Sequence, residues 1–119
     1  MLYGNARITA IDENGQSYID DVVEGDLWNF ESGVAHSIQA LDKGCEFLLV
    51  FSEANFSENE TLLLSDWLAH TPNEVVAANF KKTQEELKDL PAKQKYIFNG
   101  TIPGPIAEED RPNPAGHTK

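Results

Sequence analysis

Apolar and polar residues alternate along much of the first half of the chain, with the period of two that is typical of β-strands. In the first run, Ala6, Ile8 and Ala10 share one side. Asn14-Gly15 then separates two alternating runs, which is a strong hairpin signal because both residues tolerate a positive φ. The pattern predicts short strands over residues 2–11, 16–22, 27–30, 34–39 and 45–52, with turns at residues 31–33 and 41–44. Such closely spaced strands indicate an antiparallel sandwich or barrel.

The second half of the chain has the sequence pattern of short helices followed by an extended tail. Capping-box pairs of a hydroxyl residue and a glutamate three positions later occur at Ser57/Glu60, Thr71/Glu74 and Thr83/Glu86. They predict helices near residues 62–69, 72–79 and 84–90. All six prolines lie from Pro72 onward, and residues 102–119 are rich in Pro and Gly. We therefore expect a β region over residues 1–60, short helices over 61–101 and a Pro-rich linker or disordered tail over 102–119.

Length and charge limit the classes of function. At 119 residues the chain is a single domain or part of one. Its formal net charge of −11 argues against nucleic acid and against an anionic membrane as partners, because phosphate groups require clustered Lys and Arg. A site for a small anion would then depend on a local cation such as a bound metal ion. No apolar run approaches the roughly 20 residues that cross a bilayer, and no secretory signal is visible, so we expect a soluble protein.

Two residue types are scarce enough to restrict the metal chemistry. Cys45 is the only cysteine, which excludes an internal disulfide and a cysteine-based zinc site. His36 shares one face of its predicted strand with Val34 and Ile38. A histidine in this setting is either a hydrogen-bonded core imidazole or a metal ligand that faces a cavity. One imidazole alone does not hold a metal, so the local pattern leaves both interpretations open.

The spacing around His36 resembles the second conserved motif of the cupin superfamily. Gly25, Glu31, Gly33, His36 and Ala40 match the motif positions, with Glu31 where Pro is usual and Ala40 where Asn is usual. Further segments resemble the N-terminal cupin of bacterial manganese oxalate decarboxylases, and the resemblance extends from Met1 to about Gly104. These segments are Tyr3–Thr9, Glu24–Trp28, His36–Ala40, Phe56–Asn59 and Asp66–Pro72.

The resemblance implies a mainly β fold: an incomplete cupin jelly-roll barrel or sandwich, followed by short α-helices and the Pro-rich tail. It implies that His36 is the third histidine ligand of a Mn(II) site, and that dioxygen is a co-catalyst. The substrate of the family is oxalate, a small dicarboxylate that is converted to formate and carbon dioxide. Family members are cytoplasmic homo-oligomers, trimers or hexamers. His70 matches a position that is not a ligand, and His117 lies in the tail.

Glu58 is the candidate catalytic residue. In the family, the matching glutamate lies on a mobile lid and handles protons while carbon dioxide leaves and formate forms. The local sequence allows a structural role instead, because Ser57 and Glu60 bracket Glu58 as a capping box and acidic residues are favoured in a first helical turn. Glu60 also departs from the small residue that is usual in the family. The added negative charge could alter lid closure or the pKa of Glu58.

The start of the chain matches the end of the first metal motif of the family. Gly4 aligns with its closing glycine, which places the glutamate ligand and both other histidines upstream of Met1. We therefore expect a truncated chain that lacks three metal ligands and is inactive by itself. Two hypotheses follow: the chain is part of a manganese-dependent oxalate decarboxylase, or it is a non-catalytic cupin remnant that acts as a binding or assembly module.

Overall fold

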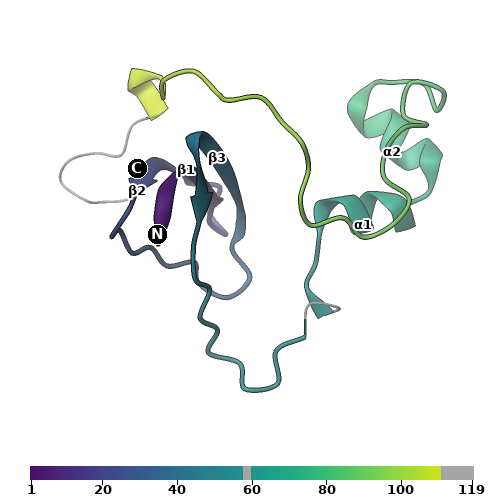
Figure 1. Cartoon of the computed structure of the whole chain (residues 1–119). Coiled ribbons are helices and arrows are strands. Elements are labelled where there is room, and N and C mark those ends of the chain that lie inside the picture. Colours follow the sequence, from purple (N-terminus) through teal and green to yellow (C-terminus); the bar gives the residue numbers. More distant parts are fainter. Residues whose placement is uncertain (58–59, 111–119) are drawn as a thin grey trace. The chain divides into compact units, whose positions relative to one another are not determined.

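The computed structural model describes residues 1–57 and 60–110 (Figure 1). Two compact units are formed: Met1–Val50 together with the described residues from Thr101 onward, and Phe51–Gly100. The predicted domain boundaries after residues 60 and 101 stay a prediction. The elements are β1 (Tyr3–Ile11), β2 (Ser17–Val23), β3 (Ala35–Glu46), α1 (Leu64–His70), α2 (Asn73–Phe80) and the 3-10 turn η2 (Glu108–Asp110).

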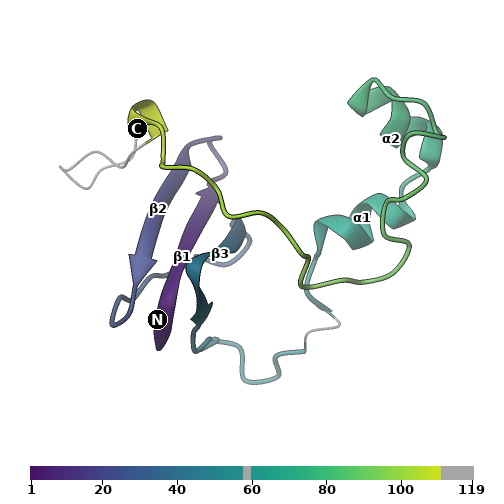
Figure 2. The same cartoon turned by 45° about the horizontal axis from the view of Figure 1, so that its top comes forward.

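The first unit is built on an antiparallel three-stranded sheet with the order β2-β1-β3, which Figure 2 shows with β1 in the middle. The predicted hairpin between β1 and β2 is confirmed. Gly15 has a φ of +75°, and the Asp12 carboxylate accepts hydrogen bonds from the backbone N–H groups of Asn14 (2.9 Å) and Gln16 (2.8 Å). The Asn-Gly pair therefore turns the chain as its sequence predicts.

The apolar side of the β1 pattern forms the core of this unit. Ala6 and Ile8 are buried, together with Met1 and Val22. The strand register explains the grouping, because Val22 lies opposite Ala6 and Ile38 lies opposite Ile8. Side chains directly opposite each other in neighbouring strands lie on the same face and pack together. The half-buried residues against this cluster are Trp28, Phe30, Ile38, Cys45 and Phe47.

The predicted turn at residues 41–44 is wrong, because β3 continues through it to Glu46. The register slips here: Gly4 pairs with Cys45, whereas Ala6 pairs with Ala40. The Asn5 side chain bridges the slip, since its Nδ2 donates to Asp42 Oδ1 (2.7 Å) and its Oδ1 accepts from the backbone N–H of Lys43 (3.1 Å). Turn-forming residues therefore produce a bulge within one long strand.

The predicted strand over residues 27–30 does not form, and of the predicted strand over residues 45–52 only Cys45 and Glu46 lie in a strand, as the end of β3. Residues 27–30 and 47–52 lack strand pairing, although the ring of Trp28 meets that of Phe47 edge to face with centroids 5.8 Å apart. Leu48, Leu49 and Val50 are 71%, 52% and 86% exposed. Sequence alone predicted this stretch to be a buried strand because it is apolar and rich in β-forming residues. A strand also requires a neighbouring strand, and these residues have none among the described part of the chain.

The other face of the sheet is covered by the chain that returns after residue 100. Arg7 lies opposite Asp21 on one side and Gln39 on the other. The Arg7 Nη1 donates to the carbonyl oxygen of Gly104 at 2.8 Å, and the Gln39 Nε2 donates to that of Thr101 at 3.2 Å. We call residues 101–106 the strap. Residues 101–107 form neither helix nor strand, and the predicted linker or disordered tail over residues 102–119 stays a prediction.

The second unit contains the helices, and two of the three predicted ones are confirmed within two residues. The capping boxes differ in outcome. Thr71 does not cap α2; its hydroxyl donates instead to the carbonyl of Trp67 at the end of α1 (2.7 Å). Thr83 and Glu86 do form a capping box, with Thr83 N to Glu86 Oε2 at 2.8 Å and Glu86 N to Thr83 Oγ1 at 3.2 Å.

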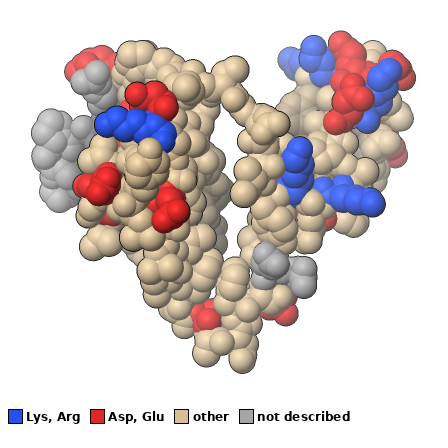
Figure 3. Space-filling model, viewed as in Figure 1, with Lys and Arg blue, Asp and Glu red and all other residues tan. Residues whose placement is uncertain are grey.

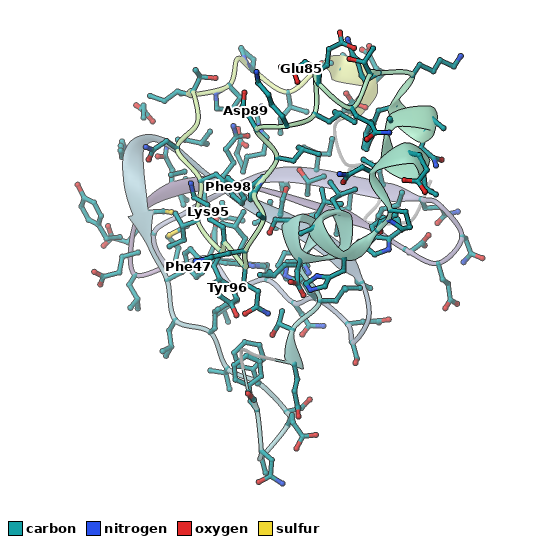
Figure 4. All side chains as sticks on the ribbon, turned by 90° about the vertical axis from the view of Figure 1, so that its right-hand side faces the viewer. Phe47, Glu85, Asp89, Lys95, Tyr96 and Phe98 are labelled. Carbon is teal, nitrogen blue, oxygen red and sulfur yellow. The ribbon has the colours of Figure 1, made fainter. Side chains whose placement is uncertain are left out.

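The predicted helix over residues 84–90 is wrong, because its hydrogen bonds join residues three apart and form successive turns. They run from Leu87 to Gln84, Lys88 to Glu85 and Leu90 to Leu87. The segment that follows packs back on α1 through the Ser65 hydroxyl, which donates to the carbonyl of Lys95 at 3.4 Å. The Lys95 ammonium lies 4.9 Å from the centre of the Phe98 ring, both labelled in Figure 4. No helix in the described residues has the length and apolar character needed to span a bilayer.

Candidate metal-binding site

The sheet places His36 on the face that sequence analysis predicted. His36 lies opposite Ala10, and Ile38 lies opposite Ile8, so the imidazole is on the same face as the apolar cluster. The side chain of His36 is nevertheless exposed. Among the described residues the imidazole is therefore not enclosed in a core, and its interpretation as a metal ligand stays a prediction. An accessible neutral imidazole can donate a lone pair to a metal ion, so the position of His36 is compatible with the role of a ligand.

A tight turn delivers the chain to His36. The backbone N–H of Val34 donates to the carbonyl of Glu31 at 3.2 Å, which closes the turn predicted over residues 31–33. Gly33 has a φ of +81°. Type II turns require a positive φ at their third position, and glycine adopts it without steric cost. The turn therefore brings the aromatic run before it back alongside the first residues of β3.

One ring nitrogen of His36 is held by the backbone. The Nδ1 atom lies 2.8 Å from the carbonyl oxygen of Val34. A carbonyl oxygen accepts and does not donate, so this contact assigns the proton of the neutral imidazole to Nδ1. The Nε2 atom then carries the free lone pair. Metal-binding histidines are typically fixed in this way, with the second nitrogen donating to a carbonyl or a carboxylate.

Phe30 forms the other support of the imidazole. Its ring stacks on that of His36 with the centroids 4.0 Å apart and the planes inclined by 15°. Phe30 itself is half-buried and packs against the core cluster. The sequence pattern predicts Phe30 in a strand over residues 27–30 and gives it no role in the site. The sequence signal that could have indicated it is the turn at Gly33. This turn lies between Phe30 and His36 in the sequence and folds one segment back on the other.

A complete metal site is not formed by the residues that the structure describes. No group of three or more His, Cys, Asp and Glu side chains among them is close enough to hold a metal ion. His36 has the donor chemistry of one ligand, whereas His70 lies in α1 with its Nδ1 2.8 Å from the carbonyl of Asp66. Glu58 and His117 both lie outside the described residues. Of the predicted metal ligands, the described residues therefore contain His36, which can fill one coordination position of a metal ion. The catalytic assignment of Glu58 stays a prediction.

Charge around the sheet is predominantly acidic. Arg7 and Lys43 are the only Lys or Arg residues among the first 50, and Figure 3 shows more basic side chains on the helical part than on the sheet. Arg7 is engaged by Asp21 and by the strap, and the hydrogen bonds to Asp21 raise the pKa of its guanidinium. The described sheet residues thus offer an anion little attraction of their own.

The sequence matches the family model described as Cupin over residues 1–88. The chain belongs to the cupin family. This cupin is 59% identical over 116 residues to the oxalate decarboxylase OxdC of Bacillus subtilis, a match that covers 98% of this chain and 30% of that protein. A probable oxalate decarboxylase of Arthroderma benhamiae is 40% identical over 78 residues, which covers 65% of this chain and 19% of that protein.

Solved structures agree with these relationships. The formate complex of Lactobacillus farciminis oxalate decarboxylase superposes with a TM-score of 0.83 at 64% identity, covering 97% of this cupin and 34% of that chain. The chain therefore spans between about a fifth and a third of the length of these relatives. The predicted fold class is confirmed: a mainly β, incomplete cupin barrel with short helices after it.

Proposed function

We propose that this cupin is part of a manganese-dependent oxalate decarboxylase, which converts oxalate to formate and carbon dioxide. The observation that carries the proposal is the arrangement of His36: the Val34 carbonyl fixes its Nδ1, which leaves the lone pair of the neutral ring on Nε2, and the residue is exposed in the described part of the chain. Strong similarity to bacterial oxalate decarboxylases supports the substrate. A B. subtilis oxalate decarboxylase structure, 60% identical, belongs to a study of its Mn(II) centres, which supports the metal.

His36 would supply one imidazole ligand through Nε2, and the remaining ligands would come from outside the described residues. When bound, manganese supplies the local positive charge that a dianion such as oxalate needs near an otherwise acidic sheet. The apolar cluster beside His36 would help to exclude water from that position. By resemblance, dioxygen is a co-catalyst, and the enzyme is a cytoplasmic homo-oligomer of trimeric or hexameric type.

Glu58 would handle the proton of the reaction. The assignment is supported by its match to the lid glutamate of the family, in the sequence Ser57-Glu58-Asn59. A carboxyl group near the reacting carbon can hold the proton that replaces the departing carbon dioxide, so that formate is released with its C–H bond formed. The alternative role of Glu58, as a residue of a first helical turn, predicts that its substitution leaves turnover unchanged.

A chimera tests the proposal directly. The matching segment of the B. subtilis enzyme, 59% identical over 116 residues, is replaced by residues of this chain. We expect the chimera to bind manganese and to release formate from oxalate. His36→Ala in the chimera should remove manganese from the site that contains it, whereas the matched variant His70→Ala should leave manganese content unchanged. A chimera that folds and retains full manganese after His36→Ala would contradict the proposal.

The competing hypothesis, a non-catalytic remnant that acts as a binding or assembly module, is separated by the same experiment. It predicts a folded chimera of the right assembly state that neither retains manganese at the grafted site nor turns over oxalate. Size-exclusion chromatography with light scattering, elemental analysis and formate detection on one preparation distinguish the two.

A further inference from the structure

The imidazole of His36 is held by two contacts that act on different degrees of freedom. The Phe30 ring, 4.0 Å away and inclined by 15°, fixes the plane of the imidazole. The Val34 carbonyl, 2.8 Å from Nδ1, fixes which edge of the ring faces the backbone. The final torsion of a histidine side chain is intrinsically broad, so an exposed ring without such contacts samples many orientations.

These contacts have a chemical consequence for the tautomer. The stack on Phe30 still allows two orientations of the imidazole, which are related by a half-turn about the bond from Cβ to the ring. Only one of them places Nδ1 beside the Val34 carbonyl. A free neutral imidazole prefers its proton on Nε2, which would block that atom as a metal ligand. The tautomer with the proton on Nδ1 is therefore sustained by the hydrogen bond, and the hydrogen bond is sustained by the stack.

We propose that Phe30 is a positioning residue that, together with the Val34 carbonyl, keeps His36 in the tautomer whose Nε2 is free to bind a metal ion. Phe30 is suited to this task because it is itself packed against the core cluster of Met1, Ala6, Ile8 and Val22. The Gly33 turn, with its φ of +81°, lies between Phe30 and His36 in the sequence and reverses the chain between them. The inference about the tautomer stands independently of the proposed function, and its consequence for metal binding rests on that function.

The tautomer is measurable on the 119-residue chain without metal. Long-range ¹H–¹⁵N correlation spectra of the histidine rings, recorded at about pH 8.5 where an ordinary imidazole is neutral, distinguish a protonated Nδ1 from a protonated Nε2. His36→Gln assigns the His36 signals, and His70 serves as an internal reference in the other compact unit. We expect His36 of the unaltered chain to carry its proton mainly on Nδ1.

Variants of Phe30 test the role of the stack. Phe30→Leu removes the aromatic face and keeps an apolar side chain, so the tautomer ratio of His36 should shift roughly 2- to 10-fold toward protonated Nε2, the factor expected for one lost aromatic pair. Phe30→Tyr should restore the ratio of the unaltered chain. Phe51→Leu is the matched control, because it removes the stack of Phe51 on Phe56 (3.9 Å, 10°) in the other unit and should leave the ratio unchanged.

Folding is monitored in the same samples through the amide signals of Ile8 and Val22, which are buried in the core. Should Phe30→Leu fail to fold, Phe30→Met keeps more of the side-chain volume and carries the same expectation. The proposal is overturned if His36 of the unaltered chain carries its proton on Nε2, or if a folded Phe30 variant without an aromatic ring retains the original ratio.

Mn²⁺ alone, added to the same chain, separates the inference from the proposed function. One imidazole binds Mn²⁺ only weakly, so the comparison is relative: paramagnetic broadening should affect the His36 ring signals at lower Mn²⁺ concentration than those of His70. Phe30→Leu should raise the concentration needed by roughly 10-fold, as for other residues that orient a ligand. A shifted tautomer with no preferential broadening of His36 would keep the positioning role and contradict the metal assignment. Preferential broadening of His36 that Phe30→Leu does not alter would support the metal assignment and contradict the positioning role of Phe30.

Discussion

Arg7 and Asp21 form a two-pronged ion pair across neighbouring strands, with Nε to Oδ1 at 2.8 Å and Nη2 to Oδ2 at 3.0 Å. This geometry uses two of the three guanidinium nitrogens and leaves Nη1 for the Gly104 carbonyl at 2.8 Å. The Arg7 side chain is only 13% exposed, whereas that of Asp21 is 38% exposed. Arg7 therefore joins the first hairpin of the chain to the strap on one face of the sheet.

Removing Arg7 should release the strap. We expect Arg7→Ala to lower the free energy of unfolding by about 1 kcal/mol, because the ion pair is partly exposed and the Gly104 carbonyl can turn to water. The heteronuclear ¹H–¹⁵N NOE of Gly104 should fall to the values of a flexible segment, while that of Ile8 stays high. Asp21→Asn is the control: it removes the charge pair and keeps Arg7 for Gly104. An unchanged Gly104 NOE in Arg7→Ala would contradict this role.

Gly4 should be irreplaceable for a geometric reason. A Cβ atom at this position would lie 2.0 Å from the Gly44 carbonyl oxygen, and Gly4 has a φ of +78°. Gly4→Ala combines a backbone clash with left-handed strain, so it should cost more than about 2 kcal/mol. Gly15→Ala has a similar φ of +75° and no atom within 4 Å of the new Cβ, so it should cost about 1 kcal/mol from strain alone. Urea unfolding of both variants measures the difference.

The difference between these two glycines also shows what the sequence can predict. The turn at Gly15 follows from Asn14-Gly15 between two alternating runs, and all its determinants are local. The requirement for glycine at position 4 arises from Gly44, across the bulge in β3, and no local pattern contains it. The error over residues 41–44 has the same origin, because the Asn5 side chain decides between a turn and a bulge from 37 residues away.

The candidate site likewise has one part that the sequence predicts and another that it does not. His36 could be found because motif spacing and strand alternation both mark it, and its predicted face is confirmed. Its supports, the Phe30 ring and the Val34 carbonyl, depend on the exact path of the turn between them and carry no compositional signature. The strap contact to Arg7 spans 97 positions of sequence, so it could be seen only in three dimensions.

The Thr83 capping box should weaken in acid. The pKa of Glu86 is lowered, chiefly because the Thr83 backbone N–H donates to its carboxylate, with a further contribution from the Thr83 side chain. A group whose pKa is lower in the folded chain stabilises it above the unfolded value and loses that effect as the pH falls through the folded value. NMR titration should show the Thr83 amide signal shifting with Glu86 in this range. Thr83→Ala, which removes the hydroxyl, should raise the pKa of Glu86 toward its ordinary value.

Glu58→Gln in the chimera tests the proposed proton transfer. The substitution keeps the size of the side chain and removes the ionisable proton, so turnover of oxalate should fall by roughly two to four orders of magnitude. Manganese content and melting temperature should hardly change. If Glu58 serves only in a first helical turn, the loss is at most about 1 kcal/mol of stability and formate release continues. Unchanged formate release with full manganese occupancy would refute the catalytic assignment.

The strap also imposes an order on the folding of the chain during its translation. The hairpin of β1 and β2 joins residues close in sequence and needs only the first 23 residues, and β3 can add to it as soon as Glu46 has emerged. Arg7 cannot reach its last partner until Gly104 has been synthesised, after the whole helical unit has been made. One face of the nascent sheet is thus left without its cover throughout the translation of residues 51–100, and during that interval it is open to chaperones.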